Sequence, residues 1–254
     1  YKFNKLKNIH LGVVSNGSID VVGEDVSCPE KSLGIGNCRV LTQEFPNTRA
    51  KYLDIDLISS SNPRFTSMVK NIINETCSDT YESVIAYRNG YRWEQKIEKI
   101  DLSPSDSNYI KEGGVYLITG GLGGIGLLTA NIISRQTNVE FILTYKSDIP
   151  ERKNWDKWLK ENNEDSDIRD KINGVKEIEE KGSVVHLRQV DVADFDSMND
   201  MVTVFEDEFS IINGVIHSAG SVGGGVIVLK DLESIKPVFD SKFRGTLILN
   251  EIFE

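Results

Sequence analysis

The sequence is poor in the residues that bind metals or form disulfides. It has only three histidines and three cysteines, and Cys28, Cys38 and Cys77 are widely spaced. No Cys-x-x-Cys pair and no group of histidines accompanies them, so the pattern favours neither a zinc site nor a disulfide framework. We expect free, buried thiols in a reducing cytosol.

The sequence also lacks an excess of basic residues and any long apolar run. Its 39 acidic residues outnumber 29 basic ones, for a formal net charge of −10. This balance disfavours nucleic acid and anionic membranes as main partners, because no surplus of cations exists to neutralise their phosphates. No apolar run of about 18 residues and no signal-peptide core occurs. We expect a soluble, cytoplasmic protein and, because it begins at Tyr1, a part of a longer chain.

The most informative feature that is present is a glycine-rich turn within residues 115–126. Residues 115–118 predict a buried strand, and an apolar helix face follows the turn at Leu127, Ala130 and Ile133. The free N–H groups and positive end of such a helix attract a pyrophosphate, which glycines allow to approach the backbone. Glycines also occur in ordinary loops, but this context predicts nucleotide binding. The turn residues are Thr119, Gly120, Gly121, Leu122, Gly123, Gly124, Ile125 and Gly126.

The chain divides into two regions with different patterns. Residues 113–254 alternate strands and helices, which indicates an α/β fold with a doubly wound parallel Rossmann sheet. Residues 1–112 predict an α/β layer without a phosphate loop, which we interpret as a structural partner. The boundary is placed at a polar, breaker-rich stretch that ends at Glu112.

The periodicity predicts individual elements in both regions. In the first, we expect strands at residues 9–15, 19–22, 38–41 and 50–57, a helix at 65–77, and a hairpin at 83–93 around Asn89-Gly90. In the second, we expect strands at residues 115–118, 139–144, 183–187 and 214–217, with helices at 124–135, 172–178, 198–209 and 234–253. The charged stretch 148–170 is long for a connection, and we interpret it as a surface insertion with Trp155 and Trp158 on a short helix.

The residues at the strand ends predict which dinucleotide binds. An NAD site places Asp or Glu about 20 residues beyond the glycines. This chain has Lys146 and Ser147 there, which suit a 2′-phosphate and favour NADPH, the alternative being a solvent-facing lysine. Asp191 and Val192 follow the third strand, where they would accept a hydrogen bond from the adenine amino group and cover the ring. A helix cap is the alternative for Asp191.

The fourth strand ends in small residues that would let the backbone approach a cofactor. These are Ser218, Ala219 and Gly220. We interpret the preceding His217 as a hydrogen-bonded core residue rather than a catalytic base.

Three separated motifs give the second region a family resemblance. They are residues 113–126, residues 214–220 (Gly-Val-Ile-His-Ser-Ala-Gly) and residues 241–245 (Ser-Lys-Phe-Arg-Gly). In this order they resemble the catalytic half of a ketoreductase (KR) domain of modular polyketide synthases, within the short-chain dehydrogenase/reductase (SDR) superfamily. Residues 1–110, notably 28–31 and 43–47, resemble the structural subdomain of that family, a degenerate Rossmann half without cofactor. The sequence of this region resembles that of the corresponding regions in trans-acyltransferase polyketide synthases.

The resemblance implies an activity and a catalytic lysine. The activity is NADPH-dependent reduction of an α- or β-ketone on an acyl chain, tethered through phosphopantetheine to an acyl carrier protein beside neighbouring synthase domains. The family's lysine corresponds to Lys242, whose ammonium would stabilise the tyrosinate left after proton donation. A plain surface lysine is the alternative.

Other residues of the family pattern are missing or different. The family's serine, tyrosine and asparagine would follow Glu254, so residues 1–254 alone are not expected to complete the proton transfer. The alternative function is therefore a non-catalytic Rossmann-like scaffold module of a synthase. One stereochemical class carries a Leu-Asp-Asp motif after the Ala-Gly, whereas this chain has Val222-Gly223-Gly224, which disfavours that class.

Overall fold

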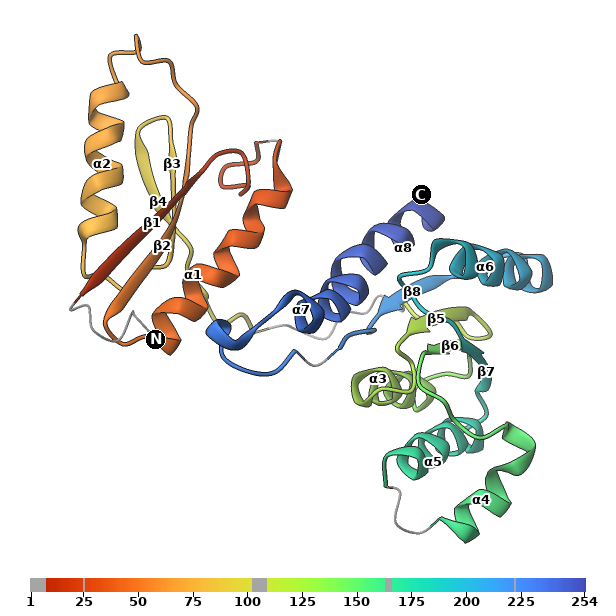
Figure 1. The fold of residues 1–254 in the computed structure, drawn as a ribbon. Helices are drawn as coiled ribbons and strands as arrows, with labels where there is room; N and C mark the ends of the chain where they lie inside the picture. Colours follow the sequence, from red (N-terminus) through yellow and green to blue (C-terminus); the bar gives the residue numbers. More distant parts are fainter. Residues whose placement is uncertain (1–7, 25, 102–108, 163–165, 222) are drawn as a thin grey trace. The chain divides into compact units, whose positions relative to one another are not determined.

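The computed structural model describes residues 8–24, 26–101, 109–162, 166–221 and 223–254. The chain forms two compact units, of which the first comprises Tyr1–Leu102 with Gly225–Lys230 and the second Ser103–Gly224 with Asp231–Glu254 (Figure 1). The first unit thus includes a short segment that follows the last strand of the second unit.

The first unit is built on a four-stranded sheet in the order β1-β2-β3-β4. The first three strands are parallel, and β4 returns antiparallel through the expected Asn89-Gly90 turn. The helices α1 and α2 pack against opposite faces of this sheet. Of two neighbouring residues in β2, Tyr52 packs in a cluster with α1 and Leu53 packs in a cluster with α2. The elements are β1 (Ile9–Ser15), α1 (Leu33–Glu44), β2 (Thr48–Ile55), α2 (Phe65–Cys77), β3 (Val84–Arg88) and β4 (Tyr91–Glu94).

The predicted strand at residues 38–41 is wrong, because this segment belongs to α1. Ile35, Cys38 and Leu41 recur at helical spacing and pack with Ala50 and Tyr52 of β2. The expectation of three buried thiols is also only partly correct: all three are free, but only Cys38 is buried, while Cys28 is half-buried and Cys77 exposed. Burial raises the pKa of the Cys38 thiol.

The predicted strand at residues 19–22 is wrong as well. A backbone carbonyl of this segment accepts a hydrogen bond from a buried arginine instead of from a neighbouring strand. The guanidinium of Arg88 at the end of β3 donates to the carbonyl oxygen of Ile19 at 2.8 Å and to Asp54 Oδ2 at 2.6 Å. It also forms an ion pair with Glu24. The segment after β1 therefore folds over the carboxyl edge of the sheet instead of extending it.

The segment 225–230 packs on α1 within the first unit. It contains a 3-10 turn, η4 (Ile227–Leu229), and the backbone N–H of Ile227 donates to Glu44 Oε2 at 2.7 Å. This contact holds the segment by the C-terminal end of α1.

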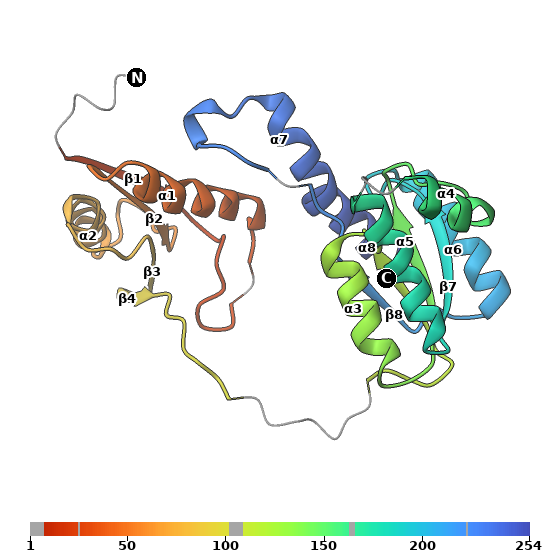
Figure 2. The ribbon, with the colours of Figure 1, turned by 90° about the horizontal axis from the view of Figure 1, so that it is seen from below.

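The second unit has an all-parallel sheet in the order β7-β6-β5-β8. Its strands and helices confirm the predicted alternation and the Rossmann-like fold class. Helices α3, α4 and α5 pack on one face with the cluster around Phe141, and α6 packs on the other with the cluster around Ile142 (Figure 2). The elements are β5 (Val115–Thr119), α3 (Gly124–Ser134), β6 (Glu140–Tyr145), α4 (Trp155–Glu161), α5 (Ser166–Glu180), β7 (Val184–Gln189), α6 (Phe195–Phe209) and β8 (Gly214–His217).

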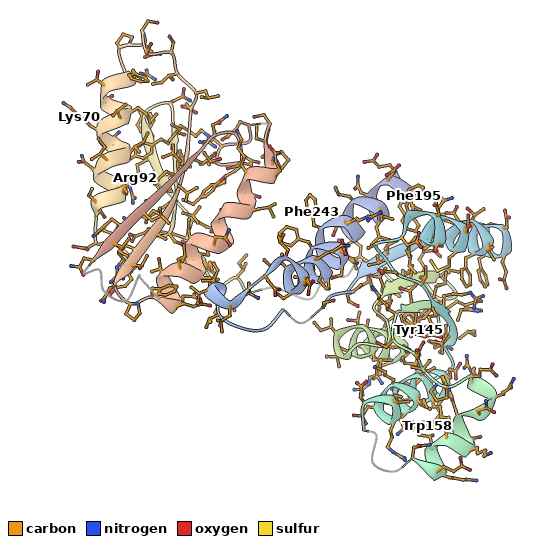
Figure 3. The ribbon with its side chains drawn as sticks, viewed as in Figure 1. Lys70, Arg92, Tyr145, Trp158, Phe195 and Phe243 are labelled. Carbon is orange, nitrogen blue, oxygen red and sulfur yellow. The ribbon has the colours of Figure 1, made fainter. Side chains whose placement is uncertain are left out.

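The described residues of the charged stretch 148–170 are mostly exposed, but two tryptophans anchor the stretch to this core. Trp155 on α4 is 3% exposed, and its indole N–H donates to the carbonyl oxygen of Pro150 at 2.8 Å. Trp158 packs against the same cluster (Figure 3). The two tryptophans thus attach α4 to the cluster that α5 also covers.

The last helical segment confirms the helix predicted at 234–253 but contains an irregular turn. It consists of α7 (Leu232–Phe239), a π-helical turn (Asp240–Arg244) and α8 (Gly245–Phe253). Asp231 and Ser234 form a capping box at its start, and Pro237 lies inside α7. A Cβ added at Gly245 would lie 2.9 Å from a methyl carbon of Val192, so this glycine allows close packing on the loop that follows β7.

Among the described residues, no helix is long and apolar enough to cross a membrane.

Candidate cofactor site

A cleft of about 490 Å³ lies at the carboxyl ends of the four parallel strands of the second unit. The strand order reverses at β5: β6 and β7 follow one another on one side of β5, and the chain then returns to place β8 on the other side. Ligands of doubly wound folds bind at such a switch point. The cleft brings together most of the residues singled out in the sequence: Gly120, Leu122, Gly123, Lys146, Ser147, Asp191, Val192, Ser218, Ala219 and Gly220.

Two glycines of the turn are required by close backbone contacts. Gly120 has φ +62°, and a Cβ there would lie 2.6 Å from the Cα of Ala219. At Gly126 a Cβ would lie 2.5 Å from the carbonyl oxygen of Gly120. The turn after β5 therefore packs directly against the end of β8 and against the first turn of α3.

The start of α3 presents backbone N–H groups without protein acceptors. Within the described part of the chain, no acceptor accompanies the amides of Gly124, Ile125 and Gly126, and the first two residues are exposed. Such groups at a helix N-terminus suit an anionic ligand. By contrast, Gly121 donates its N–H to the carbonyl oxygen of Thr144 at 2.8 Å, so it has a structural contact instead.

The buried Thr119 holds the ends of β5 and β8 together. It is fully buried, and its Oγ1 lies 2.6 Å from Nδ1 of His217, the residue paired with it in the sheet. Ser218 Oγ donates to the carbonyl oxygen of Thr119 at 2.6 Å. The other ring nitrogen of His217 contacts the carbonyl oxygen of Ser241 at 3.1 Å, so both nitrogens have partners, as expected for a core histidine.

Lys146 and Asp191 face each other across the end of the cleft. Lys146 Nζ donates to Asp191 Oδ2 at 2.6 Å, and the N–H of Ala193 donates to Asp191 Oδ1 at 3.0 Å. Burial alone would raise the pKa of the Asp191 carboxyl, but these hydrogen bonds and the charge of Lys146 outweigh it and lower the pKa. Gln189 fixes the loop, because its amide donates to the carbonyl oxygen of Lys146 at 3.2 Å and to Asp148 at 2.8 Å.

Lys242 lies just behind the cleft wall. It belongs to the π-helical turn, and its Cε would lie 3.4 Å from a Cβ added at Gly220. Single π turns inside helices often occur at functional sites. The first residue of the Val222-Gly223-Gly224 stretch lies outside the described residues, so the structure adds nothing about the position of a stereochemical motif.

Comparisons with known proteins agree with this geometry. Residues 114–254, more than half of the chain, match the family model described as "KR domain". The chain belongs to the KR domain family.

This KR domain is similar to segments of very long synthases. It is 32% identical over 170 residues to "Polyketide synthase PksM" of Bacillus subtilis (strain 168), an alignment that covers 67% of this chain but 4% of that protein. It is 27% identical over 227 residues to PksL of the same organism, covering 86% of this chain and 5% of that protein. The chain thus spans a small fraction of the curated relatives it matches.

Solved structures support the fold of both units. A ketoreductase domain from the bacillaene assembly line matches with a TM-score of 0.69 at 22% identity, covering 99% of this chain and 52% of that one. The ketoreductase from the first module of phoslactomycin biosynthesis in Streptomyces sp. HK803 matches with a TM-score of 0.72 at 20% identity, covering 96% and 52%. At these identities the likeness establishes the fold.

The cleft of this KR domain also contains residues that the sequence did not indicate. Besides Ser241 of the motif at residues 241–245, the cleft is lined by Lys171 on α5, Pro237 on α7 and Asp240 in the π-helical turn, which the sequence did not single out. They are distant in sequence from the strand ends, and only the packing of α5 and α7 brings them there. No pattern of spacing in the sequence could have identified them.

Proposed function

We propose that this domain uses NADPH to reduce an α- or β-ketone on an acyl chain carried by an acyl carrier protein. The observation that carries the cofactor assignment is the cation and hydroxyl of Lys146 and Ser147 in the cleft wall after β6. No Asp or Glu stands at residues 145–147 to accept from a ribose 2′-OH, as an NAD site requires. A 2′-phosphate fits these residues better.

The residues of the cleft match the parts of such a dinucleotide. The unpartnered amides of residues 124–126 at the start of α3, which directly follow the cleft residue Gly123, suit the pyrophosphate, and Asp191 in the cleft wall suits the adenine amino group. Lys146 can serve both Asp191 and a phosphate, because an ammonium has three donor hydrogens. NADPH supplies the hydride, while the protein binds and orients the reactants.

The position of Lys242 supports a role in proton transfer. Its side chain lies beside Gly220, at the end of β8, where the nicotinamide half is expected to extend from the switch point. There its ammonium would hydrogen-bond a tyrosinate and stabilise the charge left after that tyrosine protonates the product oxygen. The tyrosine, serine and asparagine of the family motif are not assigned to residues 1–254.

The partners follow from the relatives and are part of the proposal. The similar proteins are polyketide synthases that are far longer than this chain. We infer that the domain acts in the cytoplasm next to other synthase domains and receives its ketone on phosphopantetheine.

A titration with reduced dinucleotides tests the proposal. Purified protein of residues 1–254 is titrated with NADPH and NADH while tryptophan fluorescence and heat are recorded. We expect NADPH to bind at least about tenfold more tightly than NADH, the effect of one charge-assisted contact. Lys146→Ala should reduce this preference, whereas Lys157→Ala on exposed α4 should not. Binding of neither dinucleotide would favour the non-catalytic scaffold.

A further inference from the structure

A second lysine, Lys171, lines the same cleft as Lys146. Lys171 comes from α5 and shares the cleft wall with Tyr145, Ser147 and Ile149, which follow or end β6; Tyr145 is labelled in Figure 3. The charged side chains in the cleft wall are Lys146, Lys171, Asp191 and Asp240. Because Lys146 is paired with Asp191, Lys171 is the cation of this wall whose partner lies outside it.

The backbone of Lys171 is held rigidly. The next residue, Ile172, and the residues one and two turns later, Val175 and Ile178, are fully buried in the core beneath α5. The side chain of Lys171 is 17% exposed, compared with 76% for Lys146. A mostly buried stem loses less freedom when its ammonium binds a ligand, and its charge is less screened by solvent.

The present partner of Lys171 is easily exchanged. Its Nζ contacts Asp167 Oδ2 at 2.5 Å, one helical turn earlier, and the Asp167 side chain is 76% exposed. Because the Asp167 carboxylate is exposed and solvated, this pair between neighbouring helical turns contributes little to stability. A phosphate in the cleft would therefore compete well for this ammonium.

A ribose 2′-phosphate requires more positive charge than Lys146 provides. A phosphate monoester carries close to two negative charges at neutral pH. Lys146 contributes one positive charge, which it shares with the carboxylate of Asp191 at 2.6 Å. The chain itself has a net charge of −10, so the compensating charge has to be local.

We propose that Lys171 is the second cation for the 2′-phosphate and thus a residue that determines the preference for NADPH over NADH. This rests on the proposed function, because it presumes that the cleft binds a dinucleotide. It assigns a binding role to α5, whose first residues belong to the charged stretch 148–170.

The test compares ligands that differ only in the phosphate. Calorimetric titrations of the wild type and Lys171→Met with NADPH, NADH, 2′,5′-ADP and 5′-AMP report on binding without turnover. We expect Lys171→Met to weaken NADPH and 2′,5′-ADP about tenfold and to change NADH and 5′-AMP less than about twofold. Lys171→Arg should retain most of the preference. Lys176→Met removes the same charge from α5 outside the cleft wall and should leave all four affinities unchanged.

A second variant tests the role of Lys171 in binding the 2′-phosphate if Lys171→Met fails to fold. Asp167→Asn removes the competing carboxylate, and its side chain is exposed, so folding should be unaffected. We expect it to strengthen NADPH binding about twofold without a change for NADH, the size of a helical surface pair. Unchanged NADPH affinity in both variants, or an equal loss for NADPH and NADH, would overturn the role of Lys171 while the proposed function stands. A wild type that binds neither dinucleotide would instead overturn the proposed function.

Discussion

Nε2 of His217 lies 3.1 Å from the carbonyl oxygen of Ser241, the residue directly before Lys242. A carbonyl oxygen only accepts, so this nitrogen carries the proton, and in the neutral ring Nδ1 accepts from the hydroxyl of Thr119. The imidazole therefore connects the end of β5 to the π-helical turn. The position of Lys242 depends in this way on a residue of β8.

Replacing His217 should loosen that turn. His217→Leu removes the hydrogen bonds of the imidazole to the buried Thr119 hydroxyl and to the Ser241 carbonyl oxygen, which should cost about 2 kcal/mol of unfolding free energy. Denaturant unfolding measures the loss, and amide exchange should accelerate in residues 240–244. Thr119→Val, which removes only the hydroxyl contact, should affect residues 240–244 less. An unchanged exchange rate there in His217→Leu would show that His217 does not position Lys242.

Lys242→Ala should separate catalysis from cofactor binding. In a polypeptide that continues to the expected tyrosine, turnover of a ketoacyl thioester should fall by about 100-fold or more, because the tyrosinate loses its stabilising charge. NADPH affinity should change little, since Lys242 lies behind the wall beside Gly220. Lys236→Ala on the exposed side of α7 provides the control. Unchanged turnover would remove Lys242 from the mechanism.

Two glycines of the turn should respond differently to the same substitution. Gly126→Ala places a methyl group 2.5 Å from the carbonyl oxygen of Gly120, so we expect a loss of about 1–3 kcal/mol of unfolding free energy. Gly124→Ala meets no atom within 4 Å and should be neutral or stabilising by up to about 1 kcal/mol, because alanine favours the helix. Urea unfolding of both variants gives the comparison, and equal losses would contradict this account of the turn.

The stability of the first unit should depend on pH through Glu24. The hydrogen bond from Arg88, together with one from the N–H of Val22, lowers the pKa of Glu24 from 4.5 to about 2. A folded-state pKa below the unfolded value stabilises the fold above pH 4.5, and this contribution is lost as the pH falls towards 2. The stability difference between the wild type and Glu24→Gln should therefore be constant above pH 4.5 and shrink below it.

Exchange of the β3 amides at a series of pH values measures this difference within the first unit. Glu30→Gln removes an exposed carboxylate from the same part of the chain and serves as the control. A difference between the wild type and Glu24→Gln that stays constant down to pH 2 would contradict the ion pair with Arg88.

Much of the second unit was predictable because its pattern is local. Continuous apolar strands, the glycine turn at 119–126 and the helical spacing of residues such as Ile172 and Val175 each lie within a few neighbouring residues. The order of these elements also predicts the parallel sheet, since strand–helix–strand connections favour one arrangement. The strand ends then bring Lys146, Asp191 and Gly220 to one edge without further information.

The errors in the first unit arise where distant residues decide the local structure. Residues 38–41 have the composition of a strand, but Cys38 and Leu41 pack as a helix against β2. Ile19 follows an extended segment, but its carbonyl oxygen binds Arg88, a residue of β3. In both places tertiary contacts outweigh weak local preferences.

The fold class, the glycine turn and the family motifs could be predicted from the sequence, because each depends on residues that are close along the chain. Only the tertiary structure decided that Trp155 is buried, that Lys146 pairs with Asp191, that His217 supports the turn of Lys242 and that Lys171 enters the cleft. The physical reason is that side-chain contacts between separate elements depend on how helices and strands pack, and packing depends on the whole unit.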